Sequence, residues 1–90
     1  MSKISTITEA DILAEIIDPD QAGLNLEVAR SFLELKFSKK SEKRIRQLLR
    51  KNNRGAITAA ERAALEKYLR VGQFLDLLQA KARLSLQEAS

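Results

Sequence analysis

The sequence predicts an all-α fold of four helices, in which the third and fourth helices form a long antiparallel hairpin and two shorter helices precede it. Three observations lead to this prediction. Apolar residues recur at steps of three and four, helix-capping residues separate the periodic segments, and Gly55 with Thr58 and Glu61 can end one helix and begin the next. We expect a single helical domain over residues 1–90, with acidic N-terminal helices in 1–35 and the hairpin in 39–86.

The first helix is predicted over residues 9–17. Thr8 is placed to accept a hydrogen bond at its N-terminus, and acidic residues follow in the first turn, where they complement the helix dipole. Pro19 ends this helix, because proline disfavours helical geometry at the residue before it.

The second and third helices each follow a polar capping residue. Asn25 predicts a helix over residues 26–35, and Ser38 predicts one over residues 39–53. The end of the second helix has no clear signal.

The turn of the hairpin has the clearest local signal in the chain. Gly55 suits the left-handed conformation that commonly follows a helix, because glycine adopts it at little steric cost. Thr58 and Glu61 have the spacing of a capping box, in which each side chain accepts from the other residue's amide. The fourth helix is therefore predicted over residues 59–84.

The fourth helix is too long for its partner to cover. At 1.5 Å per residue the third helix is about 22 Å long and the fourth about 39 Å. The far half then needs another cover, either the first two helices or a second chain, and the breadth of the apolar surface favours a second chain. Gly72 within the helix indicates close approach by another backbone. The predicted partner-binding residues are Tyr68, Val71, Gly72, Leu75, Leu78 and Ala82.

Charge is distributed unevenly along the chain, whose net charge is +4. Residues 1–35 carry two basic and seven acidic side chains, whereas residues 36–56 carry nine basic and one acidic. On a helical wheel the basic residues of the third helix fall in one arc opposite Ile45, Leu48 and Leu49. Its candidate contacts to DNA or RNA are Lys40, Lys43, Arg46, Arg50 and Arg54. No aromatic residue interleaves them for base stacking, so a solvated or internally paired face is the alternative.

Composition argues against an enzyme. The chain contains no cysteine and no histidine, which excludes Ser–His and Cys–His catalysis and thiolate metal sites. No metal, cofactor or small-molecule substrate is expected. The N-terminus lacks the apolar core of a signal peptide, and no apolar run has membrane-spanning length, so we expect a cytoplasmic protein that does not bind membranes.

The second half of the chain carries a recognisable pattern: a helix, a Gly-x-Leu-Thr-x-x-Glu turn, and a helix ending in Leu-Leu-Gln-x-Lys-Ala-Arg. The matching residues are Gly55, Ile57, Thr58, Glu61, Tyr68, Gly72, Leu77, Leu78, Gln79, Lys81, Ala82 and Arg83. Ile57 stands where leucine is usual. This pattern resembles a group of small, mostly uncharacterised bacterial all-helical proteins, some of which are similar to antitoxin-like partners of nucleases. The resemblance implies a partner-binding role and assigns no functional residue.

We therefore predict a non-catalytic protein-interaction module, regulatory or antitoxin-like, that docks through its C-terminal helix. Its partner is a protein, with a nuclease encoded nearby or a second copy of the chain as candidates. The alternative is a sequence-tolerant DNA- or RNA-binding protein that uses the basic face of the third helix.

Overall fold

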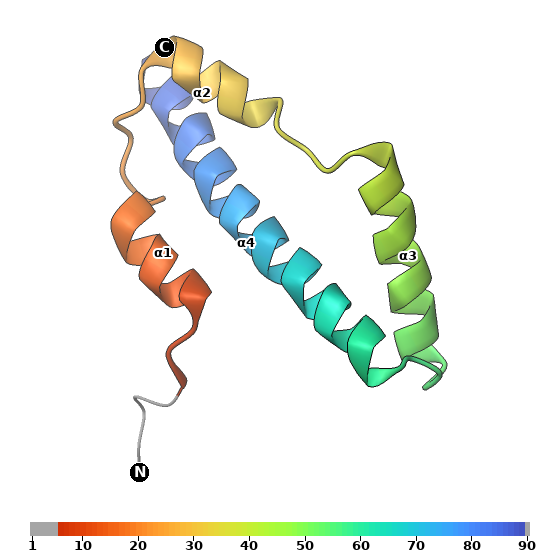
Figure 1. Ribbon diagram of the computed structural model, residues 1–90. Coiled ribbons are helices and arrows are strands. Elements are labelled where there is room, and N and C mark those ends of the chain that lie inside the picture. The colour runs from red at the N-terminus through yellow and green to blue at the C-terminus, as the bar shows by residue number, and fades with distance from the viewer. Residues whose placement is uncertain (1–5, 90) are drawn as a thin grey trace. The chain divides into compact units, whose positions relative to one another are not determined.

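A computed structural model describes residues 6–89 as four α-helices, with no strand among these residues (Figure 1). Their bounds are α1 (Glu9–Ile17), α2 (Leu26–Leu33), α3 (Lys39–Asn53) and α4 (Ala59–Glu88). The two long helices, α3 and α4, contact each other. The predicted all-α fold with a helical hairpin and two shorter N-terminal helices is confirmed.

The helix boundaries follow the capping residues. Thr8 and Asp11 form a reciprocal capping box at the start of α1. Asn25 accepts from the amides of the first turn of α2, and Ser38 accepts from the Ser41 amide at the start of α3. The bounds of α1 and α3 match the predicted ranges because these short-range hydrogen bonds depend on local sequence alone.

Two helix ends differ from the prediction. Helix α2 stops two residues early, at Leu33, where the amides of Glu34 and Leu35 donate to carbonyls three residues back and tighten the last turn. Helix α4 continues past residue 84 to Glu88. No glycine or proline follows Gly72 to stop it.

The turn after α3 is a Schellman motif. Gly55 has a φ of 71°, its amide donates to the Asn52 carbonyl, and the Ala56 amide donates to the Lys51 carbonyl. Thr58 then begins α4: its Oγ1 accepts from the Glu61 amide at 3.1 Å, and the Thr58 amide donates to Glu61 Oε1 at 3.0 Å. The predicted turn is confirmed at both of its ends.

Replacing Gly55 by valine is expected to destabilise the protein by about 1–3 kcal/mol, because a β-branched residue is strained at positive φ. No atom lies within 4 Å of a Cβ built at this position, so the cost is one of backbone conformation and not of space. Thr58→Ala removes the cap at a cost of about 1 kcal/mol. Chemical denaturation of both variants, with Ala56→Val as the control, measures these effects. Equal losses for Gly55→Val and Ala56→Val would contradict the turn assignment.

Helix α4 contributes to two compact units of the chain. The hairpin unit consists of Lys36–Gly72, and the terminal unit combines the described residues up to Leu35 with those from Gln73 onward. That the two units act as one domain stays a prediction.

The hairpin unit has a small core. Leu48 of α3 and Leu65 of α4 are 3% and 4% exposed. The rings of Phe37 and Tyr68 meet edge to face with centroids 6.0 Å apart. A Cβ built on Gly72 would lie 3.8 Å from the Phe37 ring, so a side chain lies against this glycine, and not the other backbone that the sequence indicated.

The terminal unit covers the far half of α4 from within the chain. Residues of α1 and α4 line a common hollow, and α2 lies beside the C-terminal part of α4 (Figure 1). Ala29 of α2 and Ala82 of α4 are fully buried. The first two helices therefore lie on the half of α4 for which the sequence favoured a second chain as cover.

Three polar side chains of α4 hold the N-terminal backbone in this unit. Gln79 Nε2 donates to the Phe32 carbonyl in α2 at 3.1 Å and to the Leu35 carbonyl just after it at 2.8 Å. Lys81 Nζ donates to the carbonyls of Asp18 and Gln21 after α1. The buried Ser85 hydroxyl accepts from two amides of the 23–24 loop and donates to the Lys81 carbonyl. These contacts give residues of the Leu-Leu-Gln-x-Lys-Ala-Arg ending a structural role.

Candidate functional site

The hairpin unit carries two adjoining hollows that share Arg44, which we name together the hairpin groove. The apolar part, of about 450 Å³, is lined by Phe37, Ser41, Arg44, Ala60, Ala63, Ala64, Lys67, Tyr68 and Val71. The cationic part, of about 370 Å³, is lined by Arg44, Gln47, Leu48, Arg50, Lys51, Arg54 and Glu61.

The apolar part is hollow because α4 carries alanines where larger side chains would fill the space beside α3. Ala60, Ala64, Lys67 and Val71 recur at steps of four, three and four, which places them on one face of the helix. The alanines form a shallow floor, and Val71 remains 53% exposed. This face offers apolar surface that the hairpin itself does not bury.

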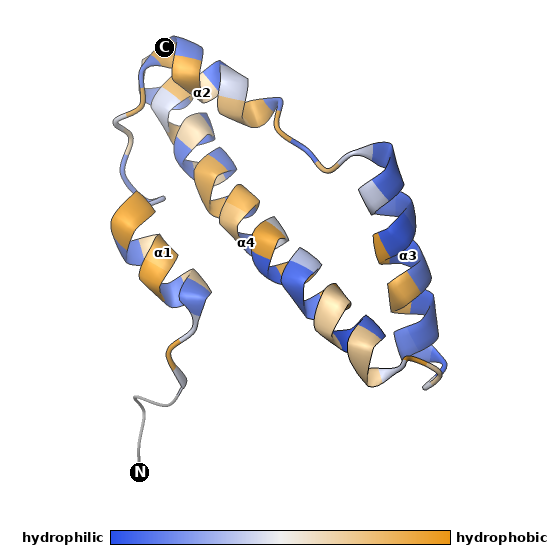
Figure 2. Ribbon diagram, viewed as in Figure 1, coloured by the Kyte–Doolittle hydropathy of each residue, from blue (hydrophilic) through white to orange (hydrophobic). Residues whose placement is uncertain are grey.

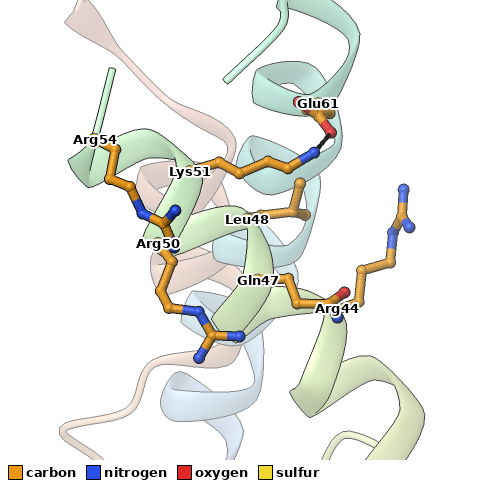
Figure 3. Close-up of a pocket in the computed structure, with 7 residues that line it drawn as sticks. All are labelled: Arg44, Gln47, Leu48, Arg50, Lys51, Arg54 and Glu61. Atoms are coloured by element: carbon orange, nitrogen blue, oxygen red, sulfur yellow. Dashed lines mark hydrogen bonds and ion pairs between the residues drawn. The ribbon is translucent and has the colours of Figure 1, made fainter. Parts of the chain in front are cut away.

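The cationic part lies along α3 (Figure 3). Figure 3 shows the Lys51 side chain passing Leu48 to reach Glu61, while the Arg50 side chain extends away from that pair. Among residues 6–89, no hydrogen bond or ion pair joins the side chains of Arg44, Arg50 or Arg54 to another residue. Their charge therefore remains available to an anionic ligand.

Glu61 links the turn to both helices. One carboxylate oxygen caps the Thr58 amide, and the other accepts from Lys51 near the end of α3. These hydrogen bonds, that of Lys51 first and that of the Thr58 amide second, lower the pKa of Glu61 from 4.5 to about 2. Glu61, the acid in the groove, is thus hydrogen-bonded to Lys51 and the Thr58 amide. The remaining charged side chains of the groove are basic, so the site has a net positive charge.

The lowered pKa of Glu61 predicts a specific acid dependence. A carboxylate with a lower pKa in the folded state binds fewer protons when folded, so it stabilises the fold above pH 4.5 and loses this effect as the pH falls towards 2. We expect the stability of Glu61→Gln to fall less steeply over this window than that of the wild type. Denaturation at several pH values tests this, with Glu66→Gln as the control. Parallel wild-type and Glu61→Gln curves would contradict it.

The predicted partner-binding residues belong to both compact units. Tyr68 and Val71 line the hairpin groove, and Gly72 lies against Phe37. The other three belong to the terminal unit, where Ala82 is fully buried and the side chains of Leu75 and Leu78 are partly covered. The N-terminal helices thus pack on the half of α4 that carries these three residues.

The predicted basic face is exposed throughout, at Lys40, Lys43, Arg46, Arg50 and Arg54. Only Arg50 and Arg54 of this set line the groove. The groove residues outside the predicted sets are Phe37, Ser41, Arg44, Gln47, Leu48, Lys51, Ala60, Ala63, Ala64 and Lys67. The sequence signal for the α4 members is the run of alanines at helical spacing beside Tyr68 and Val71.

Two properties of residues 6–89 bear on other kinds of site. They contain no group of three or more His, Cys, Asp or Glu side chains placed to hold a metal ion. None of their helices has the length and apolar character needed to cross a membrane. What the groove can do chemically is bind a ligand that combines apolar and anionic groups.

Comparison of the chain with protein-family models, with curated proteins and with solved structures found no match.

Proposed function

We propose that the protein is a non-catalytic, cytoplasmic interaction module whose hairpin groove binds an acidic amphipathic helix of a partner protein. The observation that carries this proposal is that an apolar hollow and a cationic hollow lie next to each other on one helical hairpin. A regulatory or antitoxin-like subunit, with a nuclease as its partner, is the role that the sequence resemblance implies.

The apolar part of the groove supports a helix as the ligand. Its floor of alanines lies between two helices, and amphipathic helices commonly bind such grooves through apolar side chains at steps of three and four. Tyr68 contributes a broad side chain of the kind that is enriched in protein interfaces.

The cations of the groove support an acidic ligand. Arg44 and Lys67 lie at the apolar part, and Arg50 and Arg54 extend the positive charge along α3. Complementary charge speeds association and rejects partners of the wrong sign more than it adds affinity. An acidic helix is therefore selected over a basic one with the same apolar residues.

Two synthetic amphipathic peptides of equal length test the proposal. Both carry isoleucines at helical spacing, one flanked by glutamates and the other by lysines. We expect the glutamate peptide to bind about tenfold more tightly or better, and to shift the NMR signals of Ala60, Ala63 and Lys67. Ala63→Glu should abolish this binding, and Gln87→Glu, which adds the same charge outside the groove, should not. Equal binding of both peptides, or binding by Ala63→Glu, would contradict the proposal.

The exposed cations of α3 favour a second candidate function, the sequence-tolerant binding of DNA or RNA. Joint replacement of Lys43, Arg46 and Arg50 by glutamine should weaken such binding for all sequences. It should also flatten the slope of log affinity against log salt by up to about three units. Failure of the wild-type protein to bind DNA or RNA at low salt would remove this candidate.

A further inference from the structure

Helix α1 leaves apolar side chains uncovered by its own unit. Ala10 and Ala14 face α4 across a common hollow, whereas Ile12 and Ile16 are 51% and 75% exposed. These two isoleucines are four residues apart and share one face of the helix. Figure 2 shows how much of this short helix is hydrophobic.

Acidic side chains accompany this exposed face. Glu15 lies three residues from Ile12 and next to Ile16, and Asp18 and Asp20 follow α1 closely; all three acids are exposed. Helix α1 is therefore an acidic amphipathic helix with an exposed apolar face, which is the kind of ligand that the hairpin groove fits.

We infer that two copies of this chain associate reciprocally, with the exposed face of α1 from each copy seated in the hairpin groove of the other. This inference rests on the groove as a docking site, as proposed above. Ile12 and Ile16 occupy the apolar part, and Glu15 and Asp18 face the unpaired cations of the groove.

The two surfaces favour a second copy as the occupant. Each chain offers one groove and one exposed α1 face, so a pair of identical chains carries both halves of this contact twice, and closed two-fold pairs are the commonest assemblies of identical chains. The charges also match, since residues 1–35 carry an excess of five acids and residues 36–56 an excess of eight bases. Self-association of this kind would close the groove to a partner helix.

The absence of cysteine from the sequence allows a direct test by disulfide trapping. One copy carries Ile16→Cys and a second, tagged copy carries Ala63→Cys, and the mixture is oxidised. We expect a mixed disulfide between the two copies. Glu66→Cys, exposed on α4 outside the groove lining, replaces Ala63→Cys in the control and should give at least about tenfold less product.

Sedimentation tests the same contact without crosslinking. Ile16→Ser should raise the dimer dissociation constant at least tenfold, since it removes an apolar group from the contact. Leu69→Ser, at a 49% exposed position that does not line the groove, should leave the constant unchanged. Raising the salt concentration should weaken the dimer.

A wild-type chain that stays monomeric at all concentrations would overturn the inference. So would an intrachain disulfide formed at low concentration by a chain that carries both Ile16→Cys and Ala63→Cys. Binding of the glutamate peptide to the Ile16→Ser variant separates the two proposals. If that peptide binds while the wild type remains monomeric, the docking function stands and self-association fails.

Discussion

Replacing Leu65 by alanine should lower the free energy of unfolding by about 2–5 kcal/mol, through lost burial and the cavity that is left. Leu65 is 4% exposed, and it shares the interior of the hairpin unit with Leu48, at 3%. No other large aliphatic side chain among residues 6–89 is buried to this degree. The loss is large against the 5–15 kcal/mol that typically stabilises a folded protein.

Urea denaturation followed by circular dichroism measures this effect. Leu69→Ala is the matched control, because Leu69 is in the same helix and 49% exposed, so its truncation should have a much smaller effect. Similar losses at the two positions would show that Leu65 is not a core residue of the hairpin.

Replacing Ala82 by aspartate should release the N-terminal helices from α4. Ala82 is fully buried, and an aspartate there places an unpaired charge in the interior at a cost of about 3 kcal/mol or more. The anchors from Lys81 and Ser85 to the loops after α1 lie on the same stretch of helix. We expect faster amide hydrogen exchange in α1 and α2, with the protection of α3 retained.

Gln87→Asp serves as the control, since it introduces the same charge at an exposed position of the same helix. Unchanged exchange in α1 and α2 of the Ala82→Asp variant would refute the assigned packing. Equal loss of protection in α3 would show that the terminal and hairpin units unfold together.

The sequence contains enough information to define the helices and the turn between the long ones. Thr8, Asn25, Ser38, Gly55 and Thr58 each act through hydrogen bonds or backbone geometry within a few residues. Such signals do not depend on the rest of the fold. Where a local signal was weak, at the end of α2 and of α4, the predicted boundary was wrong.

The candidate site was predicted only in part, because it depends on which faces of the helices meet. The helical wheel placed Lys51 with the other cations, but its side chain pairs with Glu61 and so does not share their lack of a partner. Tyr68 and Val71 were assigned to an interaction surface and do line the hairpin groove. Nothing in the side chains of Ala60 and Ala63 indicates a binding site. They can be assigned to one only because the fold places them in the same hollow as Phe37 and Arg44.

The sequence by itself determined the helical segments, the Gly55–Glu61 turn and the separation of acidic from basic residues along the chain. The tertiary structure alone decided that the N-terminal helices cover the far half of α4 and that a groove opens along the hairpin. The apolar periodicity of α4 shows that one face of this helix must be buried, but it does not show which helix or chain packs against that face. The choice among them rests on contacts between residues about 60 positions apart, such as those of Lys81 and Ser85.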